Sequence, residues 1–508
     1  MTSADIAASE KERLDETGVP LGGNVAADTK PESARTEAEE SGLAEAAAVE
    51  KKLVRKLDLY LIPLVMLLYL NSFIDRVNIG NARLYNLEED LGLVGNQFQV
   101  AVSILFVTYV LCEIPSNLVL KVFRPRRWIA FITVSWGIIA TLTGLVDSYG
   151  ALLACRLLLG AFEAGLFPGL TVYLTFFYTK NELAMRVGYL FVSAAIAGGL
   201  GGLLAFAIGN MDGLRGMSGW RWIMIIEGIP TVVLGVITYW ALPDDPATAY
   251  FFNKSEREIM TLRLRREYGN TTSAQQFNRR DMVKAFSDWK VWLFCIAQFG
   301  VDTMLYGYSA FLPTIIHALG DWTVEQVQLL TVPCYFLGAA TYMATAFLSD
   351  RTEKRGLFCV IFGTISVIGY ALLISTVPHG VHYLGMCFLA AAGLYVVVGL
   401  PLAWLPNNTP RYGKRTTANG MQLSIGNCAG IMAPFIYPTA DRPRYIRGHA
   451  TTLAMVGMGT CIYAFLWFWL RRQNQRRDAG YVSPKQQTLS EDELAELGDE
   501  SPRFRYTI

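Results

Sequence analysis

The segment LIPLVMLLYLNSFIDRVNIGNARL (61–84) combines a long apolar run with two adjacent charged residues, Asp75 and Arg76. A helix that spans a bilayer needs roughly 20 mostly apolar residues. Similar apolar runs recur along the 508-residue chain as far as CIYAFLWFWL (461–470), and 52% of all residues are hydrophobic whereas only 17% are charged. This composition excludes a soluble protein and predicts an all-α membrane protein.

The apolar runs predict twelve transmembrane helices in two six-helix bundles, because one long polar segment separates the first six runs from the last six. Residues 1–50 carry a net charge of −8 and residues 478–508 carry −4, so both ends are expected to be disordered tails. The predicted parts are an acidic tail (1–52), an N-terminal bundle (53–241), a central loop (242–289), a C-terminal bundle (290–472) and a second acidic tail (473–508).

The distribution of basic residues predicts the orientation. Twenty Lys and Arg residues flank the spans on the side of the termini and the central loop, against six on the other side. Cytosolic flanks of membrane helices carry such an excess, so both termini are predicted to be cytosolic. Gly160 and Pro168 recur as Gly393 and Pro401 at one common offset, which favours a duplicated transporter over a channel or a receptor.

Charged residues inside membrane spans are costly and are candidates for function. Arg156 and Glu163 are seven residues apart, hence on nearly one helix face and about 10 Å apart along the axis. In a cavity, Arg156 can attract an anion while Glu163 takes a proton. Asp75 and Arg76 fall at a depth similar to Arg156, so Arg76 and Arg156 can form a carboxylate clamp. The alternative is that each of these charges pairs with a neighbouring helix as a packing contact, or, for Asp75 and Arg76, forms an ion pair at the helix end.

The second half has fewer charges within its spans. Asp302 lies mid-span, where it either carries a proton or pairs with an amide, and Tyr306 follows one turn later. The eleventh span is polar for its depth, and its amides either bind a ligand or hold helices together. The predicted substrate-binding residues are Arg76, Arg156, Tyr306, Asn419, Gln422 and Asn427.

A further acid, Glu113, lies near the cytosolic end of the second span, where it is expected to brace a gate. Basic and acidic residues of two cytosolic loops complete this expectation. The predicted gating residues are Glu113, Arg124, Arg126, Arg127, Asp350, Arg351, Lys354 and Arg355.

Several classes of function are excluded. The chain has no G-x-x-x-x-G-K-[ST] loop, which excludes an ATP-driven pump. Its four His and eight Cys residues lack metal-ligand spacing, so neither a metal nor another cofactor is expected, and an enzyme is not predicted. The bases form short clusters beside apolar spans, which does not indicate a nucleic-acid partner.

Four strings together resemble one family: YLNSFIDRVNIGNARL (69–84), CRLLLGAFEAGLFPG (155–169), GWRWIMIIEGIP (219–230) and TANGMQLSIGNCAGIMAPFIYP (417–438). They are similar to the major facilitator superfamily and, within it, to the anion:cation symporter family and its fungal allantoate and nicotinate permease-like branch. The resemblance covers roughly residues 53–472. The superfamily's loop motif is degenerate after the second span but clearer in the second half, as LSDRTEKRG (348–356).

The resemblance implies proton-coupled uptake of a small organic anion by alternating access. Bacterial sugar-acid symporters of this family carry proton-binding acids and carboxylate-binding arginines in their first and fourth helices. By motif, Asp75 and Arg76 match the first-helix pair, and Arg156 and Glu163 match the fourth-helix pair. The predicted proton-coupling residues are Glu163, Asp75 and Asp302.

The expected partners are a small organic anion, a proton and the lipid bilayer. The anion is expected to be a carboxylate such as a vitamin, a nicotinate-like or an allantoate-like nutrient. We expect a monomer that crosses the plasma membrane many times. Two alternatives remain open, an exporter of an acidic secondary metabolite on the same fold and a nutrient-sensing receptor derived from a transporter.

Overall fold

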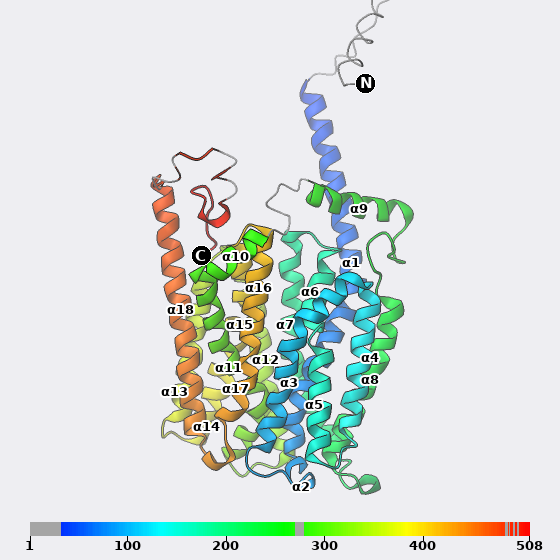
Figure 1. The fold of residues 1–508 in the computed structure, drawn as a ribbon, viewed down its shortest axis with the longest axis vertical. Helices are drawn as coiled ribbons and strands as arrows, with labels where there is room; N and C mark the ends of the chain where they lie inside the picture. The colour runs from blue at the N-terminus through cyan, green and yellow to red at the C-terminus, as the bar shows by residue number, and fades with distance from the viewer. Residues whose placement is uncertain (1–31, 270–278, 483–485, 487, 491–492, 495–496) are drawn as a thin grey trace, which may run out of the picture. The chain divides into compact units, whose positions relative to one another are not determined.

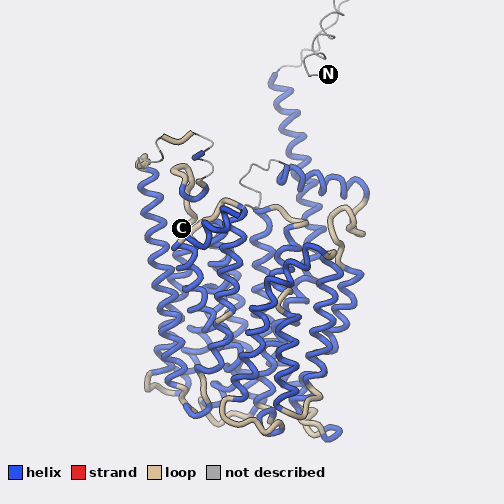
Figure 2. Tube along the Cα trace, in the orientation of Figure 1, coloured by secondary structure: helices blue, strands red, loops and turns tan. Residues whose placement is uncertain are grey.

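The computed structural model describes residues 32–269, 279–482, 486, 488–490, 493–494 and 497–508. The chain comprises two compact units, Met1–Val54 and Arg55–Ile508. Among the described residues there are helices, turns and loops but no β-strand (Figure 2). The predicted all-α class is therefore confirmed.

The helices follow one another in two halves (Figure 1). The first half contains α1 (Glu32–Arg83), which begins in the first unit, α2 (Leu87–Asp90), α3 (Gln97–Val122), α4 (Pro125–Thr143), α5 (Tyr149–Glu163), α6 (Leu166–Thr175), α7 (Lys180–Gly209) and α8 (Gly219–Ala241). Two helices of the central segment follow, α9 (Lys254–Gly269) and α10 (Arg279–Ser287).

The second half contains α11 (Trp289–Ala318), α12 (Val324–Thr352), α13 (Arg355–Ile374), α14 (His379–Tyr383), the π-helix η3 (Leu384–Ala390), α15 (Ala391–Asn407), α16 (Tyr412–Asn427), α17 (Ala429–Ile436) and α18 (Ile446–Asp478). Short 3₁₀ helices occur at Leu214–Gly216, Thr439–Asp441 and Gly498–Glu500.

Within the described part of the chain, nine helical segments are long and apolar enough to cross a membrane. They are Ala48–Arg83, Gln97–Asn117, Tyr149–Thr175, Met185–Gly209, Gly219–Ala241, Val324–Thr352, Arg355–Ile374, His379–Asn407 and Ile446–Asp478. The three other predicted spans are also helical: α4 and α11 are less apolar, and the eleventh span is divided between the shorter helices α16 and α17. Twelve spans therefore remain a prediction.

Glycines let neighbouring helices approach closely. A Cβ atom on Gly137 of α4 would lie 2.8 Å from the backbone nitrogen of Val232 in α8, and one on Gly235 of α8 would lie 2.8 Å from that of Val134 in α4. Such small residues are typical of helix contacts in membranes, where close van der Waals packing drives association. The backbones of α4 and α8 therefore touch without intervening side chains.

The repeated glycines of the fourth and tenth spans also lie at close helix contacts. Gly160 of α5 lies against the carbonyl group of Leu105 in α3, and Gly393 of α15 lies against that of Phe362 in α13. The fourth span is interrupted after Glu163, because α5 ends there and α6 begins at Leu166.

The central segment contains helical structure where a loop is expected. Its helix α9 is joined to α1 by an ion pair between Lys56 and Glu256, with an N···O distance of 2.8 Å. Its helix α10 is joined to the start of α16 by an ion pair between Asp281 and Arg411 at 2.8 Å. The two ends of the segment therefore bind to different halves, and residues 270–278 lie outside the described residues.

The structure also differs from the expectation of disorder in the tails. Residues 32–52 belong to α1, whereas 1–31 lie outside the described residues. At the C-terminus, the Asp499 carboxylate is buried and accepts hydrogen bonds from Lys290 at 2.6 Å and from Lys414 at 2.7 Å. The Thr507 carbonyl accepts one from the Trp404 indole at 2.8 Å. Acidic composition predicted a solvated tail, but lysines at the starts of α11 and α16 bind it.

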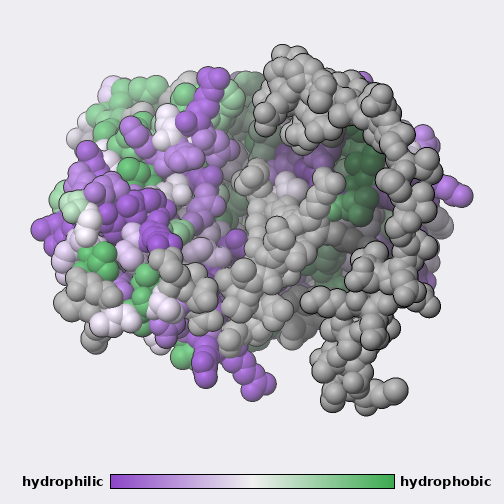
Figure 3. All heavy atoms as spheres, turned by 90° about the horizontal axis from the view of Figure 1, so that it is seen from above, coloured by the Kyte–Doolittle hydropathy of each residue, from purple (hydrophilic) through white to green (hydrophobic). Residues whose placement is uncertain are grey.

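Burial alone would raise the pKa of Asp499, but the positive charges of Lys290 and Lys414 lower it below the usual value for aspartate. The described part of this face of the molecule, at the top of Figure 1, carries many hydrophilic side chains (Figure 3). Such a surface is typical of a helix-bundle end that faces water.

Candidate functional site

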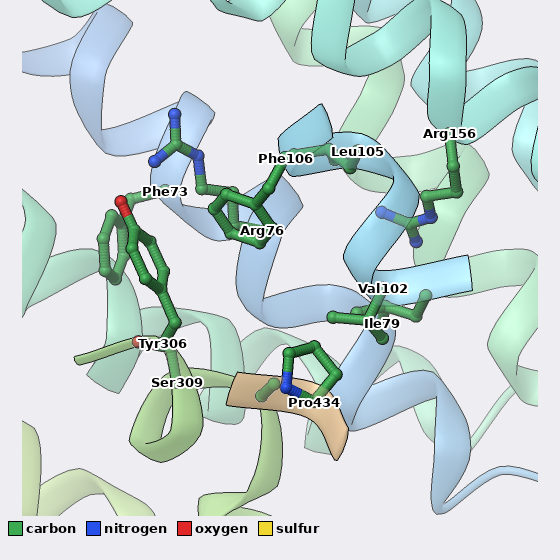
Figure 4. Close-up of a pocket in the computed structure, with 11 residues that line it drawn as sticks. Phe73, Arg76, Ile79, Val102, Leu105, Phe106, Arg156, Tyr306, Ser309 and Pro434 are labelled. Carbon is green, nitrogen blue, oxygen red and sulfur yellow. The ribbon is translucent and has the colours of Figure 1, made fainter. Parts of the chain in front are cut away.

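A cavity lies among five helices, α1, α3 and α5 of the first half and α11 and α17 of the second (Figure 4). Water can occupy about 20 Å³ of it, which is room for about one molecule. A small organic substrate can enter only if the helices rearrange. The lining residues are Phe73, Arg76, Ile79, Val102, Leu105, Phe106, Arg156, Tyr306, Ser309, Ala310 and Pro434.

Arg76 and the buried Glu163 form an ion pair beside this cavity. The Nε atom of Arg76 donates to Oε1 of Glu163 at 2.6 Å, and the Glu163 side chain is fully buried. The Ser72 hydroxyl donates to the same oxygen at 2.5 Å. The Arg76 guanidinium also lies 4.7 Å from the centre of the Tyr109 ring. Both charges are held between α1, α3 and α5, away from water.

Arg156 lines the same cavity but has no comparable partner. It is only 2% exposed, and within the described residues it forms no ion pair. Its buried Nε atom has no hydrogen-bond acceptor. In Figure 4 its guanidinium lies apart from that of Arg76, with Phe106 and Leu105 between them in this view. Because a buried cation without an ion-pair partner in direct contact is unfavourable, the site is suited to an anion.

Asp75 points to a different neighbour from Arg76. Its Oδ2 atom accepts a hydrogen bond of 2.5 Å from the indole nitrogen of Trp136 in α4, and it does not line the cavity. Successive residues of a helix point about 100° apart, which explains the divergence. Asp75 and Arg76 are adjacent in the sequence, but they therefore contact different helices, α4 and α5.

The acid of the second half lies in a neutral network. Asp302 accepts a hydrogen bond of 2.8 Å from the side-chain amide of Gln298. The side-chain oxygen of Gln298 accepts hydrogen bonds from the side-chain amide of Gln422 at 3.1 Å and from the Tyr463 hydroxyl at 3.3 Å. In the part of the chain that the structure describes, Asp302 forms no ion pair, and neither it nor Gln422 lines the cavity.

Tyr306 connects the cavity to a contact between the halves. Its hydroxyl donates to Oδ1 of Asn427 at 2.6 Å. The Asn427 amide and the Ser424 hydroxyl each lie 3.4 Å from Oε2 of Glu113, which is buried. Glu113 thus links α3 to α16. Asn419, by contrast, does not line the cavity, and its buried side-chain carbonyl oxygen has no hydrogen-bond partner among the described residues.

The basic gating candidates of the first half lie at the start of α4. Arg126 forms an ion pair with Asp244 at 3.6 Å, and Arg124 lies 4.0 Å from the same carboxylate. Arg127 is exposed. These contacts join α4 to the start of the central segment, so they do not bridge the two halves in this structure.

The gating candidates of the second half lie between α12 and α13. Arg355 forms an ion pair with Asp350 at 3.1 Å and donates to the Ala403 carbonyl of α15 at 2.7 Å. Arg351 lies over the ring of Phe347, and Lys354 is exposed. These contacts stay within one half, and the gating role of the set remains a prediction.

Three residues that donate hydrogen bonds to the candidate acids are not predicted in the sequence analysis. Ser72 precedes Arg76 by four residues and Gln298 precedes Asp302 by four, so helical spacing carries a usable signal for both. Trp136 lies on another helix from Asp75, and nothing local in the sequence indicates their contact.

Comparisons with known proteins agree with this fold. Residues 65–434 match the Major Facilitator Superfamily. A bacterial homologue of the human lysosomal transporter Spinster, solved in an inward-facing and unoccupied conformation, has a TM-score of 0.64 at 16% identity and covers 80% of this chain and 96% of its own. That likeness concerns the fold alone.

Similar fungal proteins cover nearly the whole chain. The Schizosaccharomyces pombe transporter C1002.16c is 42% identical over 90% of this chain and 90% of its own. The high-affinity nicotinic acid transporter of Saccharomyces cerevisiae is 33% identical and covers 90% and 85%, and the transporter hxnP of Emericella nidulans is 33% identical and covers 90% and 93%. The resemblance to the fungal nicotinate-like branch is confirmed, and the chain belongs to the major facilitator superfamily, a family of transporters rather than enzymes.

Proposed function

We propose that this transporter carries a small organic carboxylate into the cell together with protons, by alternating access. The observation that carries the proposal is Arg156, a buried guanidinium that lines the cavity between the halves without an ion-pair partner among the described residues. A carboxylate matches the planar donor group of arginine in shape and charge. The nicotinic acid transporter among the relatives supports a nicotinate-like substrate.

The coupling follows from competition for Arg76. Without substrate, Arg76 binds Glu163 at 2.6 Å. A carboxylate held near Arg156 attracts Arg76 as well, since both arginines line the cavity. A proton on Glu163 removes its negative charge and frees Arg76 for the substrate. Anion binding and protonation of Glu163 therefore favour each other, as symport requires.

The proposal includes the predicted topology. Twelve spans with both termini and the central segment in the cytosol are supported by the excess of Lys and Arg on that side. We place the protein in the plasma membrane as a monomer.

The test is uptake of labelled nicotinate by membrane vesicles that contain the full chain, at two values of external pH. Glu163→Gln mimics the protonated acid, so it should bind and exchange nicotinate but should not accumulate it against a gradient. A control is Glu227→Gln, because Glu227 is also buried and accepts a hydrogen bond from Asn78, but among the described residues it forms no ion pair with a cavity-lining arginine, as Glu163 does with Arg76.

Accumulation by Glu163→Gln at the parental level and with parental pH dependence would contradict the proposed coupling. If nicotinate moves only from the cytosolic side of the membrane to the opposite side, the protein is an exporter and the proposed uptake is wrong.

A further inference from the structure

Arg83, the last residue of α1, is buried in an aromatic contact that no predicted role explains. Its side chain is 2% exposed. Its guanidinium carbon lies 4.5 Å from the ring centre of Phe98 at the start of α3 and 5.8 Å from that of Phe311 in α11. It also forms an ion pair with Glu88 of α2 at 3.1 Å.

This contact joins the two halves of the bundle. Phe98 belongs to the first half and Phe311 to the second, and their rings meet edge to face with centres 6.3 Å apart. Phe311 is further fixed within the second half, where it stacks on Tyr437 at 5.5 Å. Arg83 and Phe98 of the first half therefore contact the Phe311 ring, which Tyr437 of the second half holds in place.

The contact lies next to the cavity. Ile79, four residues before Arg83 on α1, and Ala310, adjacent to Phe311 on α11, both line it. At the same level, a Cβ atom on Gly80 would lie 2.5 Å from the Ala310 carbonyl oxygen, so the backbones of α1 and α11 touch. The cation–π contact of Arg83 lies between this helix crossing and α2.

We propose that Arg83 is a gating residue that closes the cavity toward the α2 side by its cation–π contact with Phe311. The inference rests on the alternating-access function proposed above. When the halves separate on this side, the contact with Phe311 breaks, while Phe98 and Glu88 move with Arg83 because they belong to its own half. The charge thus stays paired in both states, and opening breaks the contacts of Arg83 and Phe98 with the Phe311 ring.

The experiment measures access to the cavity rather than transport. Ser309→Cys places a reporter thiol in the cavity, and a membrane-impermeant thiol reagent is applied to intact cells and, separately, to inverted vesicles. The same chain with Ser309 intact corrects for native cysteines. We expect Arg83→Gln and Phe311→Leu each to raise the labelling rate from the α2 side about 3- to 30-fold, the range that loss of a buried cation–π contact implies.

Arg221→Gln is the matched control. Arg221 lies 4.7 Å from the Trp220 ring centre and forms an ion pair with Asp147 at 2.7 Å, so it repeats the chemistry of Arg83 within one half. Its loss should leave the labelling rate unchanged. Arg83→Lys keeps the charge without the planar face and should give an intermediate rate.

Parental labelling rates in both Arg83→Gln and Phe311→Leu, at normal membrane levels, would overturn the gating role. The gating role would also be overturned if Arg221→Gln raised the labelling rate as much as Arg83→Gln does. Loss of any such arginine contact would then loosen the helix bundle in general. Labelling needs no substrate, so failure to transport nicotinate leaves this result readable. A rise seen only in inverted vesicles would reverse the predicted topology while supporting the gate.

Discussion

In the first half of the bundle, Arg76 and the buried Glu163 form an ion pair at 2.6 Å, whereas in the second half buried Asp302 contacts the neutral amide of Gln298 at 2.8 Å. Removing one member of a buried ion pair leaves an uncompensated charge, at a cost of about 3–5 kcal/mol. Altering a neutral network costs about 1–3 kcal/mol or less. The difference suggests that the first half holds the charges of the transport cycle and the second half supplies shape and hydrogen bonds.

The largest effect is expected for Arg76→Gln. Among the described residues it leaves the buried Glu163 with Ser72 as its hydrogen-bond partner, so the free energy of unfolding should fall by about 3–5 kcal/mol and transport should be lost. The midpoint of thermal unfolding in detergent and nicotinate uptake measure the two losses. The double variant Arg76→Gln/Glu163→Gln should regain stability without regaining transport. A stable single variant would show that the pair is not a strong contact.

Arg156→Lys should affect binding rather than stability. Because Arg156 forms no ion pair among the described residues, the unfolding midpoint should stay near that of the parent. The loss of the planar two-pronged donor should weaken substrate affinity about 10- to 100-fold. Arg215→Lys, at an exposed position of the short 3₁₀ helix Leu214–Gly216, is the control. Parental affinity in Arg156→Lys would remove this residue from the binding site.

The second half also holds ion pairs, but at its polar end. The pKa of Asp499 is lowered by Lys290 and Lys414 despite its burial, so its stabilising effect is present above its unfolded pKa of about 3.9 and is lost as the pH falls through its lower folded pKa. Asp499→Asn should therefore reduce stability at pH 7 by about 1–2 kcal/mol, and the difference should vanish at strongly acidic pH. Thermal unfolding over a pH series tests this, and an equal difference at all pH values would contradict it.

The smallest effect is expected for Asp302→Asn. An amide keeps an acceptor for Gln298, so stability should change by less than about 1 kcal/mol and nicotinate should still accumulate. Vesicle uptake with and without a pH gradient measures this. If the variant still exchanges nicotinate but no longer accumulates it in a pH gradient, Asp302 is a second proton-coupling residue. Both halves would then hold charges of the transport cycle.

The sequence alone determined the class of the protein and the candidates for its site. Apolar runs long enough for a bilayer can fold only as spanning helices here, because lipid cannot satisfy unpaired backbone groups. Charges within such runs are unfavourable enough to mark Asp75, Arg76, Arg156 and Glu163 without any structure. Helical spacing also placed Arg156 and Glu163 about 10 Å apart along the axis, which is too far for them to pair.

Only the tertiary structure decided which of these charges meet. Glu163 pairs with Arg76, 87 residues earlier, and Asp75 binds Trp136, 61 residues later, whereas Arg156 is left to face the cavity. Helical periodicity determines which residues share a face of one helix, but not which helix that face meets. That choice depends on the rotation and crossing of every helix in the bundle, which contacts such as that of Gly80 with Ala310 set. The Arg83 contact with Phe311 and the binding of Asp499 to its lysines depend on the same packing, so no local pattern could predict them.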